Sequence, residues 1–510
     1  HFLKSMKPSI PEPVTEVSQG LQKAGFDAYL VGGCVRDLLM ERMPKDWDIT
    51  TNAKPDAVQK IFPDSFYEND FGTVGVKISE PTTDDRRQKE MPSVVSQVIE
   101  VTTYRTESSY SDSRRPDAVV FAKTLEEDLQ RRDFTFNAIA LNVTENEKQK
   151  TNKKTPVINS PLSVLRIIDP YNGKQDIKNK LIRAVGDPNE RFDEDALRMM
   201  RAVRFHSELG FDIEKETFEA IQKNADNLKN IALERIRTEL ERIILSDRPS
   251  EGIEMLQKTG LLKYILPELE EGLGVTQNLH HTYTVWEHNI LALKTCPSKK
   301  LSVRLAALLH DVGKPRTKRG NGKHATFYNH DHIGARMTQK ILTRLRFSKE
   351  IIHHATLLVD NHLFYYNVDE VTESAVRRII ARVGLENMQD LIAVRIGDRL
   401  GSGVPKAKPY RLRHFEYMVE KVSNDPVSVK DLKIGGKDLI EKLEVQPGPK
   451  IGAILNVLLG EVIEDAKLNN PEALLARAKT LEKEDVNALC QTAKRRIAQQ
   501  QKKEEEEMKK

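Results

Sequence analysis

The chain has 510 residues, of which 39% are hydrophobic and 31% are charged, and these proportions are typical of a folded globular protein rather than a disordered one. Because a chain of this length exceeds what one hydrophobic core supports, we expect about three or four domains in series. The 80 Lys and Arg residues nearly balance the 76 Asp and Glu residues, so the net charge of +4 neither demonstrates nor excludes a nucleic-acid partner.

The number of cysteines and the hydropathy of the chain indicate in which cellular compartment the protein is expected. The three cysteines, Cys34, Cys296 and Cys490, are far apart and odd in number, which argues against a disulfide framework or a cysteine-based zinc site. No stretch approaches the roughly 18 apolar residues of a membrane helix, and the first residues lack the apolar segment of a signal peptide. We therefore expect a cytoplasmic protein that does not span a membrane.

Two kinds of periodicity divide the chain. Between residues 27 and 145, helical segments alternate with short β-rich runs, namely AYLVGG, WDITT, GTVGVKI, SQVIEVTTY, AVVFA and NAIALNV. From about residue 176, apolar residues recur at three- and four-residue steps, which is typical of helices. Polar interruptions near residues 81–97 and 145–160 predict exposed loops. The expected fold is an α+β N-terminal head, with a small mixed sheet and helices, followed by an all-α region.

The segment AYLVGGCVRDLLMERMPKDWDITT carries the first candidate site. An apolar strand runs into Gly32 and Gly33, where missing Cβ atoms let backbone N–H groups approach an anion, and a helix beginning near Val35 would direct its positive end there. Asp46 and Asp48 lie two residues apart in a β-like run, so both carboxylates share one face. Such carboxylates bind Mg²⁺ that bridges to substrate phosphates, which predicts a triphosphate cradle beside a magnesium site. The alternatives are a plain strand-to-helix turn and two solvated aspartates.

Several motifs together resemble one family. Gly-Gly-x-Val-Arg-Asp, Asp-x-Asp, FGTVGV, IEVTTYR, DSRRPDAV and RRDFTFNAIA are similar to the head domain of the class II tRNA nucleotidyltransferases, which comprise the CCA-adding enzymes and their bacterial poly(A) polymerase relatives. The resemblance continues in order through DPYNGKQDI, IRAVGDPNERFDEDALRMMRAVRF and PGPKIGAIL, so it covers almost the whole chain.

The resemblance implies roles for the first candidate site. Asp46 and Asp48 would bind the catalytic metals, two Mg²⁺ ions, and the motif that contains Gly32, Gly33 and Arg36 would bind the nucleotide. Glu100, on the predicted strand VIEV, is a candidate for a third carboxylate, with a purely structural role as the alternative.

The motif RRDFTFNAIA places Arg131, Arg132 and Asp133 before an apolar run. Guanidinium groups bind phosphate oxygens bidentately, and a carboxylate can accept hydrogen bonds from ribose hydroxyls. The resemblance implies this nucleotide-binding use, although alone the three residues would more often form a salt bridge at a helix start. The stretch YRTESSYSDSRRPDAV resembles the family's flexible loop, which relatives need for the final A addition.

Glu194, Asp195 and Arg198 form a Glu-Asp-x-x-Arg motif, followed by Arg201 and Arg204. On one helix, Asp195 and Arg198 would share a face and point at one ligand. Cytosine and adenine present an amino donor beside a ring-nitrogen acceptor, whereas uracil and guanine present the reverse, so a carboxylate with a guanidinium would accept C and A. The resemblance implies this template role, with Glu194 supporting the helix and both following arginines at the nucleotide. The alternative is an intrahelical ion pair.

The region from 280 to 400 is rich in histidine. The adjacent His310 and Asp311 are preceded by His288 and followed by His330 and Asp398, and this order resembles the HD superfamily of metal-dependent phosphohydrolases. The resemblance implies a site for a divalent transition metal and a secondary phosphohydrolase activity, with an inert helical body as the alternative. Six further histidines, including His362, receive no role.

These observations lead to one expected function. The chain would add CCA to tRNA 3′ ends without a nucleic-acid template, using CTP and ATP and releasing diphosphate. Alternatives are A addition alone, poly(A) synthesis or, from another class, an HD phosphohydrolase with an inactive head. The expected partners are CTP, ATP and the acceptor arm and elbow of tRNA, while the oligomeric state stays open.

The resemblance also divides the chain. It implies a catalytic head (1–145), the end of the head with a neck that carries the template helix (146–270), an HD-type domain (271–404), a helical tRNA-binding body and tail (405–480) and a charged extension (481–510).

Overall fold

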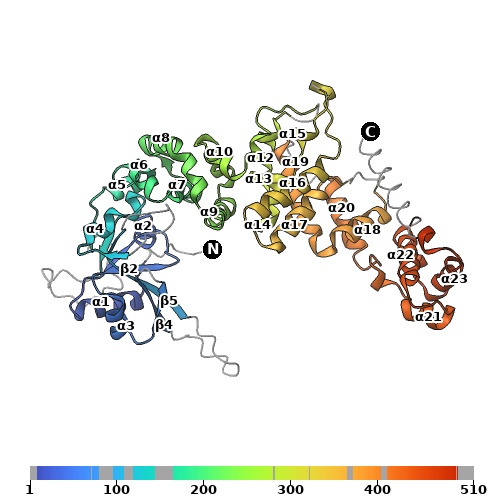
Figure 1. The fold of residues 1–510 in the computed structure, drawn as a ribbon, viewed down its shortest axis with the longest axis horizontal. Coiled ribbons are helices and arrows are strands. Elements are labelled where there is room, and N and C mark those ends of the chain that lie inside the picture. The colour runs from blue at the N-terminus through green and yellow to red at the C-terminus, as the bar shows by residue number, and fades with distance from the viewer. Residues whose placement is uncertain are drawn as a thin grey trace. The chain divides into compact units, whose positions relative to one another are not determined.

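The structure, a computed structural model, describes residues 9–69, 72–79, 96–107, 119–143, 165–278, 282–320, 322–364, 371–403, 410–489 and 491. The two polar insertions, most of the stretch that resembles the flexible loop, Cys490 and most of the C-terminal extension lie outside these residues. The chain divides into two compact units, residues 1–265 and 266–510, which Figure 1 shows in blue to green and in yellow to red.

A seven-stranded mixed sheet forms the centre of the first unit, in the order β3-β4-β5-β2-β1-β8-β9. Only β2 and β5 pair in parallel within it. The strands are β1 Tyr29–Val31, β2 Trp47–Thr51, β3 Ser65–Asn69, β4 Thr73–Ser79, β5 Ser96–Thr103, β8 Ala140–Asn142 and β9 Arg166–Ile168. A separate ribbon pairs β6 Arg105–Glu107 with β7 Val119–Phe121. Each predicted run contains a strand, whereas the short and largely polar β3 and the three-residue β9 were not predicted.

Helices α1 (Glu12–Lys23), α2 (Gly33–Leu39) and α3 (Pro55–Ile61) complete the core of the head, and Figure 1 shows α1 and α3 beside the sheet. Trp47 and Ile49 of β2 are buried in this core. Because successive side chains of a strand point to opposite faces, Asp48 between them points to the other face of the sheet. The alternation in WDITT therefore separates the core from the candidate site.

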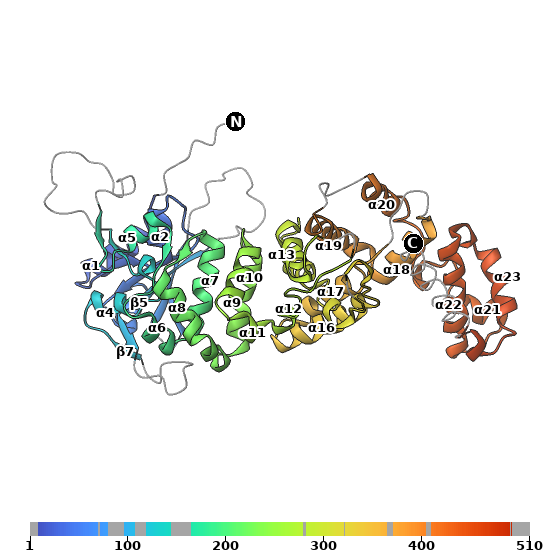
Figure 2. The same cartoon turned by 90° about the horizontal axis from the view of Figure 1, so that it is seen from above.

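The rest of the first unit is mainly helical. Figure 2 shows α7 (Leu197–Leu209), α9 (Leu233–Leu245) and α10 (Pro249–Lys258) side by side, and these three helices pack on one another. The shorter elements are α4 Leu125–Gln130, α5 Gly173–Asn179, β10 Leu181–Ile182, α6 Pro188–Glu194, β11 Asp212–Ile213, α8 Lys215–Asn224 and α11 Leu262–Ile265.

The prediction of one helix carrying both Asp195 and Arg198 is wrong. Helix α6 ends at Glu194, Asp195 has extended backbone angles of φ −147° and ψ 101°, and α7 begins at Leu197. The physical reason is local, since the Asp195 carboxylate accepts a hydrogen bond from the Leu197 N–H at 3.1 Å. An aspartate that binds a backbone N–H two residues ahead competes with the continuing helix and starts a new one.

The regular elements described in the second unit are all helices, apart from one isolated β-bridge between Arg319 and Thr326. The unit's larger core comes from α14 Leu301–Leu309, α16 His330–Arg344, α17 Lys349–Asp360, α18 Glu373–Val383, α19 Met388–Gly401 and α20 Tyr410–Lys421. Helix α13 (Val285–Thr295) packs on α14 and α19. A separate core between residues 432 and 489 joins α21 Gly436–Leu443, α22 Pro449–Glu464 and α23 Pro471–Leu481. A mixed-sheet head followed by helices confirms the predicted fold class, while the proposed domain boundaries stay predictions. Among the described helices, none has the length and apolar character needed to cross a bilayer.

Two glycines set the spacing between α13 and α19. A Cβ on Gly397 would lie 2.7 Å from the Ala292 carbonyl oxygen, and a Cβ on Gly401 would lie 2.8 Å from the Ala292 nitrogen. Such distances are too short for any side chain, so the two backbones can approach only because both residues are glycine. This close approach brings Asp398 of α19 next to His288 of α13.

Gly397→Ala should destabilise the second unit by about 1–3 kcal/mol, because the added methyl group forces the two helix backbones apart. Gly460→Ala is the matched control, since Gly460 also lies in a helix but a Cβ there meets nothing within 4 Å. Thermal unfolding of both full-length variants measures the effect. Equal midpoints for the two variants would contradict the role given to Gly397.

Candidate active site

A polar cavity of about 440 Å³ lies in the first unit. Its walls come from the turn between β1 and α2, from β2, β5 and β6, from the segment after α4, from Asp195 between α6 and α7, and from α7 and α9. Most of the predicted head residues line it, namely Gly32, Gly33, Asp48, Glu100, Arg131, Arg132, Asp133, Asp195, Arg198 and Arg201. The fold thus brings together motifs that are scattered over 170 positions of the sequence.

Two carboxylates line the cavity on neighbouring strands. In the parallel pairing of β2 with β5, Asp48 stands directly opposite Glu100. Asp46 precedes β2 and is exposed, and it is not among the residues that line the cavity. Oxygen donors on adjacent strands fit a hard divalent cation such as Mg²⁺, which prefers carboxylates and retains several waters.

The glycine turn lies against these groups. Gly32 has a φ of +75°, which favours glycine, and a Cβ there would lie 3.1 Å from Arg132 Nη1 and 3.4 Å from Asp48 Oδ2. Helix α2 begins at Gly33, two residues earlier than predicted, and a Cβ on Gly33 would meet Arg36 Nη2 at 3.6 Å. Both glycines therefore keep space open beside an arginine.

Buried aspartates hold the arginines that follow α4. Asp128 is fully buried and pairs with Arg131 at 3.2 Å and with Arg132 at 3.3 Å. Asp133 pairs with Arg201 at 2.6 Å and accepts a hydrogen bond from the Asn137 amide at 3.2 Å. Burial alone would raise the pKa of Asp133, but Arg201 and Asn137 lower it to about 2. Both aspartates are therefore ionised at neutral pH.

A second set of pairs holds the predicted template residues. Arg198 pairs with Glu194 at 2.5 Å and donates a hydrogen bond to the Arg131 carbonyl at 3.1 Å. Asp195 pairs instead with Arg235 of α9 at 2.7 Å. Although Asp195 and Arg198 do not share a helix, both line the cavity. Arg198 is thus fixed by the oppositely charged Glu194 four residues earlier, and Asp195 by the oppositely charged Arg235 of α9.

Arg36 and Arg204 were predicted at the nucleotide, but neither is among the residues that line the cavity. Arg36 donates hydrogen bonds to Asp37 and Asn137, and Arg204 is buried between Glu239 and Glu208. Glu194 also lies outside the lining and pairs with Arg198 and Arg191.

Some residues that line the cavity were not predicted, notably Thr102, Arg105, Asn137 and Arg235. Thr102 follows Glu100 by two positions and shares its face of β5, so alternation could have found it. Arg235 gives no such signal, because it is one of several arginines on an amphipathic helix.

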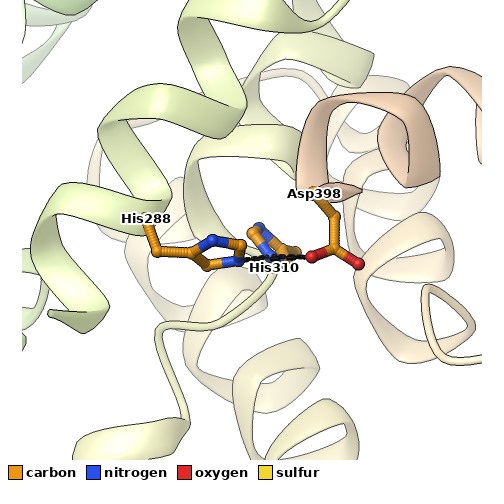
Figure 3. Close-up of side chains that lie close together, drawn as sticks. All are labelled: His288, His310 and Asp398. Carbon is orange, nitrogen blue, oxygen red and sulfur yellow. Dashed lines mark hydrogen bonds and ion pairs between the residues drawn. The ribbon is translucent and has the colours of Figure 1, made fainter. Parts of the chain in front are cut away.

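The second unit contains a buried cluster of histidines and aspartates. His288 Nε2 lies 2.9 Å from His310 Nε2, 3.1 Å from Asp311 Oδ2 and 3.3 Å from Asp398 Oδ1. Figure 3 shows His288, His310 and Asp398 pointing toward one another from three different segments. His330 Nε2 lies 3.2 Å from Asp311 Oδ1. The fold therefore brings all five predicted HD residues together.

His362, which received no role, joins the same cluster. It is buried, and its Nε2 lies 3.7 Å from Asp311 Oδ1. The six side chains form two groups whose ligand atoms lie within 4.8 Å of one another, one of His288, His310 and Asp398 and one of Asp311, His330 and His362. His362 follows α17 and belongs to none of the sequence motifs described above. The sequence therefore contains no signal that it could be a metal ligand.

Backbone contacts orient three of these imidazoles in the same way. Nδ1 of His310, of His330 and of His362 each contacts the carbonyl oxygen three residues earlier, at 2.8, 2.6 and 2.7 Å. A proton on Nδ1 that binds a carbonyl leaves the Nε2 lone pair to face the cluster, as in metal-ligating histidines. Among the described residues, Nε2 of His330 and of His362 has no hydrogen-bond partner. The donor set therefore fits divalent transition metal ions.

Comparisons with known proteins agree with this geometry. Residues 28–183 match the Poly A polymerase head domain, residues 210–273 match the "Probable RNA and SrmB-binding site of polymerase A", and residues 330–478 match domain 2 of tRNA nucleotidyltransferases. The A-adding tRNA nucleotidyltransferase of Deinococcus radiodurans is 35% identical over 368 residues, which cover 68% of this chain and 78% of the relative.

Two further proteins match nearly the whole chain. The crystal structure of the Bacillus stearothermophilus CCA-adding enzyme in complex with CTP has a TM-score of 0.67 and 28% sequence identity, and it covers 93% of this chain and 100% of that one. The CCA-adding enzyme of Ligilactobacillus salivarius is 33% identical over 471 residues, which cover 92% of this chain and 96% of the relative. The chain therefore belongs to the CCA-adding enzyme family.

Proposed function

We propose that this chain adds CCA to the 3′ ends of tRNA, using CTP and ATP and no nucleic-acid template. One observation carries the proposal: a single cavity joins two carboxylates on paired strands to several fixed arginines. Two of the relatives whose names specify CCA addition match 92% and 93% of the chain. A addition alone is the second candidate, because an A-adding relative is as similar over the part it matches.

The reaction joins the tRNA terminal hydroxyl to the nucleotide. The hydroxyl oxygen loses its proton to solvent and forms a bond to the α-phosphorus, while the bond from that phosphorus to the oxygen that bridges it to the β-phosphate breaks and diphosphate leaves with that oxygen. Asp48, Glu100 and, from the edge of β2, Asp46 would hold divalent cations, which polarise the phosphate and lower the pKa of the attacking hydroxyl. Arg131 and Arg132 would bind the triphosphate, because guanidinium groups match phosphate oxygens.

The base would be read at the other end of the cavity. Arg198 supplies donors and Asp195 supplies acceptors, which suits the edges of cytosine and adenine. Support comes from the way both groups are held, with Glu194 on the guanidinium and Arg235 on the carboxylate. Fixed partners keep the two side chains from rotating to suit uracil or guanine.

The carboxylate assignment predicts that Asp48→Ala abolishes nucleotide addition, because the metal loses its ligand, while tRNA affinity changes little. Asp46→Ala should have the same effect. Asp56→Ala is the matched control, since Asp56 is exposed on α3 and outside the cavity lining. Single-turnover addition and tRNA binding are measured on each variant. Near wild-type addition by Asp48→Ala would disprove the assignment.

The template assignment predicts that Arg198→Ala loses a base contact worth about 1–3 kcal/mol. The incorporation of UTP or GTP relative to that of CTP should therefore rise roughly tenfold to a hundredfold over wild type. Misincorporation with one nucleotide at a time is the measurement. Arg237→Ala is the control, because Arg237 forms the same kind of (i, i+4) pair with Glu241 away from the cavity. An unchanged preference for CTP and ATP in the folded variant would rule out base reading by Arg198.

A second function is proposed for the other unit. We infer that the cluster around His310 and Asp311 binds divalent transition metal ions and hydrolyses phosphate esters. Four imidazoles and two carboxylates, all buried, carry this proposal. Lys314 adds a buried cation 2.6 Å from Asp311 Oδ2, which would bind a phosphate oxygen beside the metal ligands.

The two groups of three ligands predict two metal ions per chain in the full-length protein, as measured by elemental analysis. His362→Ala should lower the ratio to about one, and His310→Ala combined with Asp311→Ala should abolish both metal binding and phosphatase activity while CCA addition persists. His353→Ala, at an exposed histidine of α17, is the control. Metal-free wild-type protein without hydrolytic activity would show that the cluster is structural.

We also infer a cytoplasmic location. Cys34 and Cys296 are buried free thiols, which suits a reducing compartment, and the substrates tRNA, CTP and ATP occur there.

A further inference from the structure

One phenylalanine in the first unit is surrounded by positive charge. Phe205 of α7 is buried, and three guanidinium groups lie over its ring, with Arg204 at 4.3 Å, Arg36 at 5.4 Å and Arg201 at 5.8 Å from the ring centroid. A significant cation–π contact occurs about once per 70–80 residues, so three on one ring mark a concentrated site. Phe134 and Phe136 pack against the same ring at an angle of nearly 90° and fix its orientation.

Arg36 connects this ring to the cavity through a chain of contacts. It donates a hydrogen bond to the side-chain oxygen Oδ1 of Asn137 at 3.2 Å, and Nδ2 of the same amide donates to Asp133 at 3.2 Å. Asp133 pairs with Arg201, and Arg201 returns to the ring of Phe205. These contacts therefore form a closed network of side chains from α2, from the segment after α4 and from α7.

This network of side chains joins the two ends of the proposed nucleotide site. Helix α2 directly follows Gly32, which lies beside Asp48, whereas α7 carries Arg198 about two turns before Phe205. Arg36 is itself mostly buried, with 12% of its side chain exposed, and does not line the cavity. Its guanidinium is thus placed to bind α7 rather than a ligand.

We propose that Arg36 is a positioning residue that holds α7 against the head, so that Arg198 stands at the correct distance from the metal-binding carboxylates to read the incoming base. The inference rests on the proposed template function of Arg198. It replaces the expectation that Arg36 binds the nucleotide. Loss of Arg36 removes one cation from the ring and the partner of the Asn137 oxygen, and leaves α7 less firmly placed.

The test compares wild type with Arg36→Gln, Phe205→Leu and the double variant, using tRNA that lacks CCA and either CTP or UTP. Arg36→Gln should lower kcat with CTP and reduce the preference for CTP over UTP on the order of tenfold, while KM for CTP and inhibition by inorganic triphosphate stay unchanged. Phe205→Leu should show the same pattern although it removes no charge. The double variant should be no worse than the more impaired single variant, because both act through one contact.

Arg166→Gln is the matched control, since Arg166 is exposed on β9 and away from the cavity lining. A higher KM for both nucleotides, weaker inhibition by inorganic triphosphate and an unchanged preference in Arg36→Gln would show that Arg36 binds phosphate and would overturn the inference. If Phe205→Leu does not fold, the Arg36→Gln measurements decide alone.

Arg198→Ala, measured in the same assay, distinguishes a failure of the template proposal from a failure of the inference about Arg36. If Arg198→Ala keeps the wild-type preference, the template proposal fails. If Arg198→Ala loses the preference and Arg36→Gln keeps it, the template proposal stands and only the inference about Arg36 is overturned.

Discussion

The pairing of cavity arginines with buried or half-buried carboxylates is the interaction on which the candidate active site depends. Asp128 holds Arg131 and Arg132, Asp133 holds Arg201, and Glu194 holds Arg198. A buried ion pair adds little net stability, because desolvation of both charges offsets their attraction. What the pairs provide is fixed orientation, so that positive charge faces the cavity without any rearrangement of the arginine side chains.

Close backbone packing has the corresponding role in the second unit. Gly397 and Gly401 let α19 approach α13, and Gly313 and Gly334 let the turn after α14 meet the start of α16, where a Cβ on Gly313 would lie 2.3 Å from the His330 carbonyl oxygen. The imidazoles and carboxylates converge because the helices that carry them are unusually near one another. The cavity and the histidine–aspartate cluster thus both depend on residues that lie outside them, such as Asp128 and Gly397.

The sequence predicted the strands of the head and the residues of the cavity where local patterns carry the information. WDITT occupies β2 residue for residue, and the predicted alternation holds for Trp47, which is buried in the core, and Asp48, which lines the cavity. It does not extend to Asp46, which precedes the strand and is not among the residues that line the cavity. The break between α6 and α7 was missed because helix propensity and apolar spacing continue through Asp195, and one side-chain hydrogen bond outweighs them. Arg235 and His362 could not be predicted, because tertiary packing alone brings them to their sites.

The central claim is that one cavity with fixed base-reading groups builds the CCA end, and the products of defined substrates test it most directly. The wild-type chain is incubated with tRNAs that lack A, CA or CCA, with CTP and ATP singly and together, and the products are sized. The account predicts two residues from CTP alone on tRNA lacking CCA, a third only when ATP is also present, and no further growth. Addition of A alone to tRNA ending in CC, with no use of CTP, or an unlimited A tail would contradict it.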